Sequence, residues 1–316
     1  MKREPSATVS SMPEPVAHAS RGVPEARVVR PRTPVIKRFR RIVAYHELLV
    51  GMTRKELKVK YKNSVLGFAW SLLNPLLYLV VFYVAFQLIL GTAVPGFPIF
   101  LLSGLLVWNL FSTGLAGACG SVVGNAGLVK KVAFPREILP LAAVGSMLVH
   151  FFLQSLVLFS VLAIVRWDVA WTYVPLMPVA LIALLLLTGA LGILLSAVNV
   201  YLRDTQHFLE LALLAWFWMT PIVYGFMTIQ NHAKWAVKVY MLNPVIPIVL
   251  VFQRAIYAKV NNTKVQPGQA GYQILPHWSF GGYAAYLGYS FAVGIVVFAL
   301  AVWVFGRSEA NFAEEL

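Results

Sequence analysis

Acidic residues and cysteine are scarce in this sequence, and their scarcity excludes several kinds of site. Of 316 residues, 12 are Asp or Glu, the two aspartates are Asp168 and Asp204, and the single cysteine is Cys119. One cysteine excludes an intramolecular disulfide and a multi-cysteine metal site. Two separated aspartates form no D-x-D pattern for a metal-bound nucleotide, and the six histidines show no metal-ligand spacing. We therefore expect no catalytic residue, no bound cofactor and no metal in this chain.

The motifs of the common energy sources for transport are missing as well. The sequence has no G-x-x-x-x-G-K-[ST] motif, so we do not expect it to bind ATP through a P-loop. A proton- or sodium-coupled carrier usually needs carboxylates within its spans, and Glu210, near His207, comes closest to such a position. An enzyme and a secondary carrier are both disfavoured. What remains is a membrane conduit that uses a gradient or an energy source on a partner subunit.

Apolar residues dominate the chain. They make up 59% of it, charged residues make up 12%, and the mean hydropathy is +0.74. Soluble proteins carry roughly 25% charged residues, so this composition indicates a polytopic membrane protein. The formal net charge of +14 does not indicate nucleic acid, because fifteen of the 26 Lys and Arg residues precede residue 63. That distribution is typical of a cytoplasmic segment at a membrane surface.

Six apolar segments are long enough to cross the hydrocarbon core of a membrane, which takes about 20 residues. They cover roughly 64–90, 98–119, 138–165, 174–199, 207–229 and 283–305. Positive residues gather on one side of these spans, first in the N-terminal segment and then at Lys130, Lys131, Arg136, Arg203 and Arg307. Because positive residues favour the cytoplasmic side, both termini are expected there. The sequence thus predicts an all-α integral membrane protein with six transmembrane helices.

The region before the first span divides into two parts. Residues 1–36 are rich in Pro, Ser, Ala and Arg without an apolar period, which predicts a disordered cytoplasmic tail. Residues 37–62 interleave apolar residues with Lys and Arg, which predicts a basic amphipathic helix, in one or two pieces, on an anionic leaflet. The alternative is a solvated juxtamembrane helix that contributes only to topology.

A further short helix is expected within the long loop 230–282. The segment LNPVIPIVLVFQRAIY (242–257) is apolar but too short to span, Asn243 can cap its start, and Pro244 suits a first helical residue. We expect this segment, which includes Arg254, to dip into the outer leaflet or to fold over the exit of a cavity as a gate. A plain surface helix is the alternative.

Five motifs, in this order along the chain, resemble one known family. They are YKNSVLGFAWSLLNPLLYLVVFYVAF, LVKKVAFPREILPL, NVYLRDTQHF, FWMTPIVYG and LNPVIPIVLVFQRAIY. Together they resemble the permease subunits of type-II ATP-binding-cassette exporters for polysaccharides, the Wzm-like family that exports O-antigen, capsule, teichoic acid or galactan. The resemblance covers about 37–316. It implies that 63–316 is a six-span exporter domain, that 37–62 is its interface helix, and that short gate helices lie on the outer side.

The resemblance also implies partners and a location. It indicates a homodimer in the bacterial cytoplasmic (inner) membrane, with two copies of a separate ATPase that binds ATP-Mg. The cargo would be a lipid-linked polysaccharide that moves from the inner to the outer leaflet. Membrane lipids are expected as further partners, and nucleic acid is not.

Two cytoplasmic segments resemble the ATPase-coupling loops of this family, and their roles are implied by that resemblance. In the first segment, Pro135 suits the first turn of the third span, and Glu137 would lie near the positive end of that helix. Topology signalling alone is the alternative role for the charges. The residues concerned are Lys130, Lys131, Phe134, Pro135, Arg136, Glu137, Arg203 and Asp204.

Two of the expected spans contain a helix-breaking proline, Pro75 and Pro221. In a bilayer, backbone groups freed by a proline must face another helix or a wet cavity, so a broken span is expected beside a pathway. Residues recur every four positions near both prolines, which predicts two stripes, each on one helical face. We expect these stripes to line a conduit at the dimer interface; helix packing or lipid contact is the alternative. The expected lining consists of Asn74, Tyr78, Phe82, Phe86, Trp216, Thr220 and Tyr224.

The function that the resemblance implies is that of a membrane-spanning permease subunit of an ATP-driven polysaccharide exporter. An exporter of lipids or small lipophilic drugs is the alternative within transport. A membrane-bound glycan-modifying enzyme is disfavoured, because it needs a catalytic acid or base that the sequence does not offer. A neighbouring gene for a P-loop ATPase would discriminate between these functions.

Overall fold

The computed structural model describes 35–62, 69–70, 73, 76–77, 80–81, 83–89, 91, 94, 96–232, 235, 237–260 and 273–316. Two features expected from the sequence lie outside these residues: the tail up to residue 34, and most of the first span, including Asn74, Tyr78 and Phe82. Phe86 lies in a short π-helix, Tyr83–Ile89, of which the backbone but not this side chain is described.

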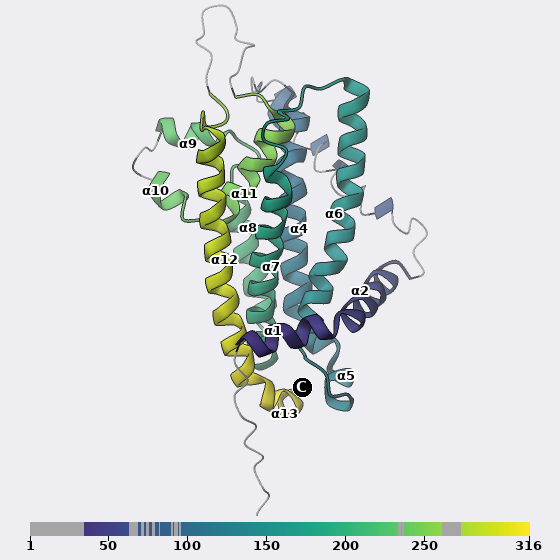
Figure 1. Cartoon of the computed structure of the whole chain (residues 1–316). Coiled ribbons are helices and arrows are strands. Elements are labelled where there is room, and N and C mark those ends of the chain that lie inside the picture. The colour runs from purple at the N-terminus through teal and green to yellow at the C-terminus, as the bar shows by residue number, and fades with distance from the viewer. Residues whose placement is uncertain are drawn as a thin grey trace, which may run out of the picture. The chain divides into compact units, whose positions relative to one another are not determined.

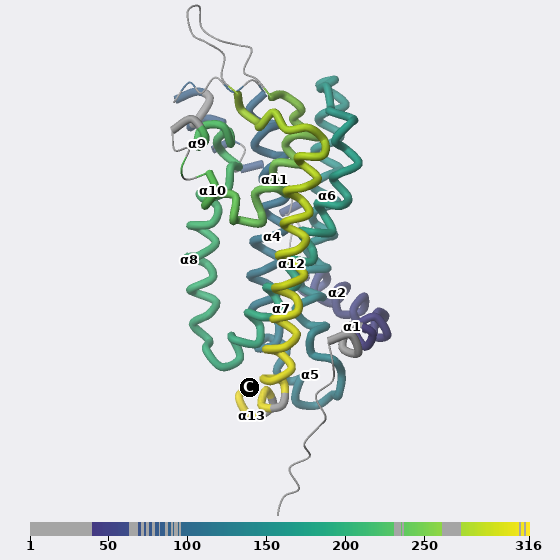
Figure 2. Tube along the Cα trace, turned by 60° about the vertical axis from the view of Figure 1, so that its left-hand side comes forward, coloured from purple at the N-terminus to yellow at the C-terminus, as the bar shows by residue number. Residues whose placement is uncertain are grey.

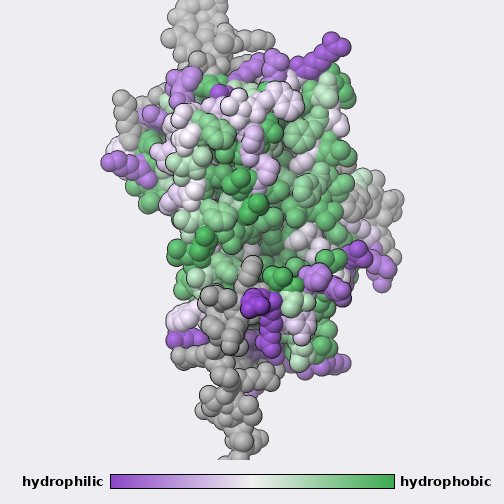
Figure 3. All heavy atoms as spheres, in the orientation of Figure 1, coloured by the Kyte–Doolittle hydropathy of each residue, from purple (hydrophilic) through white to green (hydrophobic). Residues whose placement is uncertain are grey.

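Four helices among the described residues are long and apolar enough to cross a membrane. They are α4 (Phe97–Gly124), α6 (Ile138–Val165), α7 (Leu176–Tyr201) and α12 (Phe280–Ser308). α4 packs on α6 and α7, and α7 packs on α12 (Figure 1). Their bounds agree with four of the predicted spans. In Figure 3, apolar side chains cover the middle of the visible face and hydrophilic ones gather at both ends, as expected of a multi-pass membrane protein.

The predicted span 207–229 is not one helix. α8 (Thr205–Trp218) ends after 14 residues, and a series of turns separates it from α9 (Phe226–His232). Fourteen helical residues extend about 21 Å, less than the roughly 30 Å of a hydrocarbon core. Pro221 explains the interruption, because it lacks an N–H and disfavours the helical conformation of Thr220. The described residues therefore contain four continuous spans and one interrupted segment, not six continuous helices.

The basic segment before the first span forms two helices, α1 (Val35–Ala44) and α2 (His46–Tyr61). Both run across the long helices in Figure 1, and α2 packs on α6. Ile42 and Met52 are buried, whereas the described Lys and Arg side chains of this segment are exposed. The two helices therefore place apolar side chains against the bundle and positive charge outside it.

The bundle has two ends that are named here by their short helices. The α5 end carries α5 and α13, and the α11 end carries α9, α10 and α11 (Figures 1 and 2). A large hydrophobic core joins α4, α7, α11 and α12, and a smaller separate core lies at the α5 end. The short elements are α5 (Ala126–Lys131), α10 (Val237–Tyr240), α11 (Val245–Phe252), π-helix η4 (Gln253–Tyr257), 3-10 helix η5 (Glu309–Asn311) and α13 (Phe312–Glu315).

Candidate functional site

α11 lies inside the helix bundle and not on a surface. All eight of its residues are buried, and it packs on α4, α7 and α12. The Asn243 Oδ1 atom accepts a hydrogen bond from the Val245 N–H at 3.0 Å, so Asn243 caps the start of this helix. Pro244 directly precedes the first helical residue. The burial contradicts a plain surface helix.

Side-chain hydrogen bonds join the end of α8 to the start of α11. Trp216 Nε1 donates to Asn243 Oδ1 at 2.9 Å, and Asn243 Nδ2 donates to Thr220 Oγ1 at 3.2 Å. Thr220 Oγ1 in turn donates to the Trp216 carbonyl at 2.8 Å. Two residues expected in a conduit thus form one closed cluster with a residue expected in a gate.

Tyr224 does not continue a helical stripe. α8 ends at Trp218, so the prediction that Trp216, Thr220 and Tyr224 share one helical face is wrong. The Tyr224 hydroxyl donates to the Trp218 carbonyl at 2.6 Å and lies 3.1 Å from the Tyr240 hydroxyl. Burial raises the pKa of the Tyr240 hydroxyl above its ordinary value, which favours its neutral form.

Gln253 supports the interruption of α8, although no sequence pattern singled it out. It is fully buried, and its Nε2 donates to the Pro221 carbonyl at 2.8 Å. Its Oε1 has no hydrogen-bond partner among the described residues. Gln253 also begins the π-helix η4, a distortion that is frequent at functional sites. The signal in the sequence was an amide at the end of the apolar run VIPIVLVF.

A close approach of α4 completes this site. A Cβ atom on Gly104 would lie 3.1 Å from Gln253 Nε2 and 3.2 Å from Ile222 Cγ2. Both distances are shorter than ordinary carbon contacts, so the missing side chain lets α4 pack against the turns after α8. We call the hydrogen-bonded residues of this region the α8-break network: Trp216, Thr220, Pro221, Tyr224, Tyr240, Asn243 and Gln253.

Arg254, which the sequence placed in the gate segment, is held within η4. Its Cζ atom lies 4.5 Å from the centroid of the Tyr173 ring, a cation–π contact to the loop between α6 and α7. Its Nη1 donates to the Ala258 carbonyl. Ala258 has a left-handed φ of 65° and ends the π-helix. Arg254 therefore ties η4 to the α6–α7 loop.

The first predicted coupling segment connects α5 to α6. Lys130 and Lys131 are exposed at the end of α5, whereas Phe134 is partly buried against the smaller core. Pro135 is buried three residues before α6 and not in its first turn. Glu137 is 3% exposed and directly precedes α6, where the helix dipole favours a negative charge.

Arg136 and the second predicted coupling segment lie at the same end of the bundle. Arg136 Nη1 donates to the Glu309 carbonyl, and its Cζ atom lies 5.8 Å from the centroid of the Phe312 ring. Arg203 and Asp204 are both exposed between α7 and α8. The segments thus combine exposed charges with one arginine that contacts the C-terminal residues.

Phe312 belongs to this site, and the sequence pattern did not reveal it. Its ring is fully buried, with centroids 5.2 Å from the Phe305 ring and 6.2 Å from the Tyr201 ring. The Tyr201 hydroxyl donates to the Ser308 carbonyl at 2.9 Å. The available signal was one aromatic residue in the polar ending SEANFAEEL.

Helix α2 is hydrogen-bonded to the long helices at two points. The Tyr61 hydroxyl is hydrogen-bonded to His150 Nε2, and His150 Nδ1 donates to the Ser146 carbonyl at 2.7 Å. Lys55 Nζ donates to Asn125 Oδ1 at 2.5 Å, at the junction of α4 and α5. His150 therefore joins α2 to α6, and Lys55 joins α2 to the start of the coupling segment.

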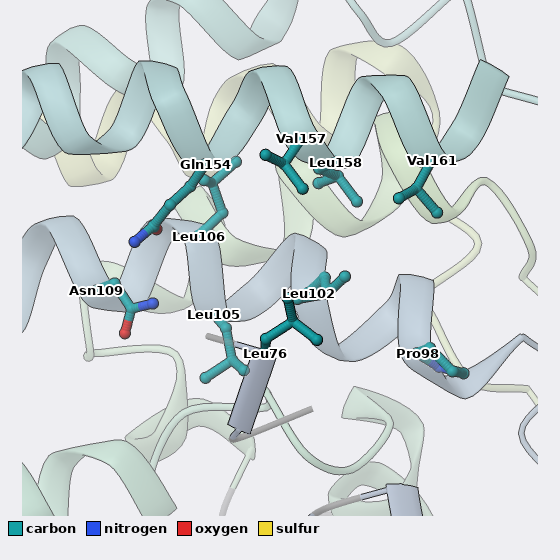
Figure 4. A pocket seen from close by; sticks show the side chains of 10 residues that line it. All are labelled: Leu76, Pro98, Leu102, Leu105, Leu106, Asn109, Gln154, Val157, Leu158 and Val161. Atoms are coloured by element: carbon teal, nitrogen blue, oxygen red, sulfur yellow. The ribbon is translucent and has the colours of Figure 1, made fainter. Parts of the chain in front are cut away.

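A cavity of about 300 Å³ lies beside α4 and α6 (Figure 4). Asn109 and Gln154 present their amides at one end of it, and the other lining side chains are apolar. A glycan needs many hydrogen-bond partners, so this lining suits a hydrocarbon chain and not a sugar. The lining residues are Leu76, Pro98, Leu102, Leu105, Leu106, Asn109, Gln154, Val157, Leu158 and Val161.

The described residues offer no cluster that could hold a metal ion. No group of three or more His, Cys, Asp or Glu side chains is brought together within them. Cys119 is buried in α4, and His150 is engaged with Tyr61 and Ser146.

Comparison with known proteins gives consistent matches. The model of the ABC-2 type transporter family matches residues 47–257. The O-antigen export system permease protein RfbA of Myxococcus xanthus is 35% identical over 223 residues, which cover 71% of this chain and 85% of that protein. RfbA of Klebsiella pneumoniae is 28% identical over 272 residues, 85% of this chain and 95% of that protein. The polysialic acid transport protein KpsM of Escherichia coli is 22% identical over 213 residues, 64% and 78% respectively.

Proposed function

Because this chain belongs to the ABC-2 type transporter family, we propose that it is the membrane-spanning permease subunit of a polysaccharide exporter. The cargo is a lipid-linked glycan of the O-antigen, galactan or teichoic-acid type. ATP-Mg binds to a separate ATPase subunit, present in two copies, and this chain is not an enzyme. The observation that carries the proposal is the 35% identity to an O-antigen export permease over 85% of that protein.

The α5 end of the bundle faces the cytoplasm of a bacterium, and the chain spans the inner membrane with both termini inside. This orientation is supported by the positive-inside rule. The first predicted span and the interrupted segment α8–α9 complete a six-span domain. The positive residues at this end are Lys130, Lys131, Arg136, Arg203 and Arg307.

The two segments at the α5 end dock on the ATPase. The exposed pair Lys130 and Lys131 and the exposed pair Arg203 and Asp204 supply charged contacts for it. Buried neighbours keep the segment rigid, because Phe134, Pro135 and Glu137 are held in or beside the smaller core. The two segments thereby transmit movement of the ATPase to the start of α6 and the end of α7.

The α8-break network is the outer gate, and its chemistry suits a hinge. The turns after Trp218 leave backbone groups that α8 no longer satisfies, and Gln253 supplies one partner at Pro221. Each neutral hydrogen bond contributes about 1 kcal/mol, so such bonds can exchange partners at modest cost. Asn243, Pro244 and Arg254 hold the buried helix against which α8 moves.

A second copy of the chain covers α8 and encloses the conduit. Phe208, Leu211 and Leu214 are 71%, 66% and 61% exposed and lie at helical spacing on one face of α8. α8 is too short to cross a bilayer alone, and a matching helix of the partner copy would bury this face. The aromatic residues of the first span complete the lining, so Tyr78→Ala with Phe82→Ala should abolish transport at a normal protein level.

Depletion of the protein in its host tests the proposed function. Labelled lipid-linked glycans are then separated by leaflet. We expect one polyprenyl-linked polymer to accumulate in the inner leaflet while the corresponding surface polymer decreases. Unchanged glycans in both leaflets would contradict the proposal.

Export of lipids or small lipophilic drugs is a second candidate function. The observation that favours it is the apolar cavity beside α4 and α6, whose lining offers hydrogen-bond partners at one end only. In that case, depleted cells would become sensitive to lipophilic compounds, and their lipid-linked glycans would keep the normal distribution.

A further inference from the structure

The C-terminal segment Ser308–Leu316 has no part in the function proposed above, yet it is firmly packed. It follows α12 as a 3-10 turn and the short helix α13. Its one aromatic residue, Phe312, is fully buried in an otherwise polar stretch. The buried ring of Phe312 therefore anchors this segment to the helix bundle.

Phe312 contacts one residue from each of the two predicted coupling segments, Arg136 and Tyr201. Arg136 lies before α6, with its Cζ atom 5.8 Å from the Phe312 ring centroid, within cation–π range. Tyr201 ends α7, two residues before Arg203, and its ring centroid lies 6.2 Å from that of Phe312. The beginning of α6 and the end of α7 therefore meet at one aromatic ring.

Backbone carbonyls of the same segment strengthen both contacts. The Glu309 carbonyl accepts a hydrogen bond from Arg136, and the Ser308 carbonyl accepts one from the Tyr201 hydroxyl at 2.9 Å. Each coupling segment is thus tied to the C-terminal segment twice, once through a ring and once through a hydrogen bond. Because hydrogen bonds are directional, these contacts fix the position of the C-terminal segment more precisely than apolar packing alone would.

The smaller core extends these contacts to the interface helix and to α5. Phe312 shares this core with Met52 of α2, Val129 of α5 and Val200 of α7. α13 also packs directly on α5. Close-packed interiors resist continuous deformation, so elements that share such a core tend to move together.

The exposed charges next to this core indicate the kind of partner. Lys130 and Lys131 are exposed on α5, and Glu314 and Glu315 are exposed on the adjoining α13. An anionic lipid surface would attract the lysines and repel the glutamates. A protein partner with charges of both signs can satisfy all four, so the mixed surface fits a folded protein and not a leaflet.

We propose that Ser308–Leu316 is a third part of the ATPase-docking surface, and that Phe312 is a positioning residue that holds the two coupling segments in register. This inference rests on the proposed function. Glu314 and Glu315 contact the ATPase, while Phe312 acts through Arg136 and Tyr201 and does not itself touch the partner.

The test uses the full-length permease with the host ATPase that co-purifies with it. Affinity for that ATPase and transport-coupled ATP hydrolysis are measured for Phe312→Ala, for the conservative Phe312→Leu, and for Trp303→Ala. Trp303 is the matched control, an aromatic residue of α12 that is 52% exposed. We expect Phe312→Ala to weaken ATPase binding about tenfold or more and Trp303→Ala to leave it near the wild-type value. Phe312→Leu should weaken binding less than Phe312→Ala, because leucine fills most of the buried volume but loses the ring contacts to Arg136 and Tyr201.

A double-mutant cycle separates positioning from general destabilisation. If Phe312 acts through Arg136, the losses of ATPase affinity in Phe312→Ala and Arg136→Ala will not add in the double variant. Additive losses would overturn the positioning role. Glu314→Lys with Glu315→Lys alters the surface without touching the core, so it tests docking even if Phe312→Ala fails to fold.

The outcomes distinguish this inference from the function on which it rests. If no ATPase co-purifies with the wild-type permease, the proposed function fails and this inference fails with it. If the wild type binds the ATPase and the Glu314→Lys, Glu315→Lys variant binds it equally well, the docking role of the C-terminal segment alone is overturned.

Discussion

At the α11 end, amide and hydroxyl side chains hold an interrupted helix, whereas at the α5 end a buried aromatic ring holds several helix ends. Asn243 and Gln253 supply directional hydrogen bonds to residues 216–221, and none of these side chains is charged. Phe312 instead packs on Phe305 and Tyr201 within a small apolar core. A network of side-chain hydrogen bonds is therefore added to the large core at the α11 end, whereas packing around one aromatic ring dominates the smaller core at the α5 end.

This difference suits two different tasks. Hydrogen bonds of about 1 kcal/mol can be exchanged one at a time, so those of the α8-break network would allow the proposed gate to rearrange at modest cost. A close-packed core loses several kcal/mol when one large side chain is removed, so the α5 end has one strongly preferred arrangement. The gate proposed at the α11 end and the ATPase coupling proposed at the α5 end would need these respective properties.

The largest expected effect is on the stability of the α5 end. Phe312→Ala should lower the free energy of unfolding by about 3–5 kcal/mol, because a buried ring is replaced by a cavity. Phe312→Leu should cost less than about 1.5 kcal/mol, since most of the volume is kept. Denaturant unfolding of the purified protein in detergent measures both. If Trp303→Ala lowered the free energy of unfolding as much as Phe312→Ala, burial of the Phe312 ring would not account for the loss.

Asn243→Ala should have the next largest effect, confined to the α11 end. The change removes a helix cap and two further hydrogen bonds, each worth about 1 kcal/mol, so local stability should fall by about 2–4 kcal/mol. Hydrogen exchange of the backbone amides of α11 and of 216–221 reports this loss. Thr220→Val is the graded control, because it keeps the cap and the Trp216–Asn243 hydrogen bond but removes the bonds of the Thr220 hydroxyl to Asn243 and to the Trp216 carbonyl, and it should cost about 1–2 kcal/mol. Unchanged exchange in Asn243→Ala would show that packing alone holds this end.

Gly104→Ala tests the close approach of α4 to the α8-break network. The new methyl group would crowd Gln253 and Ile222, so we expect a loss of about 1–3 kcal/mol from overpacking. Gly117→Ala is the matched control on the same helix, because its nearest neighbour, the Ala143 Cβ, would be 3.8 Å away. Thermal unfolding in detergent compares the two variants. Equal midpoints would mean that the site has room for a side chain.

The smallest effect at neutral pH is expected from Tyr240. Burial raises the pKa of its hydroxyl, so folding favours the protonated form. This contribution is fully present below the ordinary tyrosine pKa of about 10 and is lost as the pH rises further. The free energy of unfolding should therefore be flat between pH 7 and 9 with respect to this group, and should fall above about pH 10. In Tyr240→Phe the fall should be shallower; an identical fall would assign it to other groups.

Much of the fold follows from hydrophobic length and pattern. Leu176–Tyr201 and Phe280–Ser308 are apolar and contain no charged residue until Arg307, and the one proline in them, Pro178, lies in the first turn of its helix, where it is tolerated, so the sequence predicts both as spans. The basic stretch before the first span is likewise recognisable from its spacing. Local sequence is sufficient to predict these helices, because the backbone hydrogen bonds of each form within the helix itself.

The prediction of one continuous helix over 207–229 was wrong, because the interruption depends on contacts with residues far away in the sequence. Hydropathy is high throughout this stretch, but Pro221 frees backbone groups whose partners lie elsewhere in the chain. Nothing near Pro221 in the sequence indicates that Gln253, 32 residues later, supplies one of them. The prediction that Thr220 and Tyr224 share a helical face assumed a continuous helix, so it was wrong for the same reason.

Composition and apolar periodicity sufficed for the membrane class, for four of the spans and for the basic helices before the first span, because these properties depend on residues within one turn or one segment. Composition and periodicity did not predict the contacts of Asn243 with Trp216 and of Phe312 with Arg136. These contacts join residues 27 and 176 positions apart, and they exist because packing of long helices brings distant side chains within hydrogen-bonding and ring-contact distance.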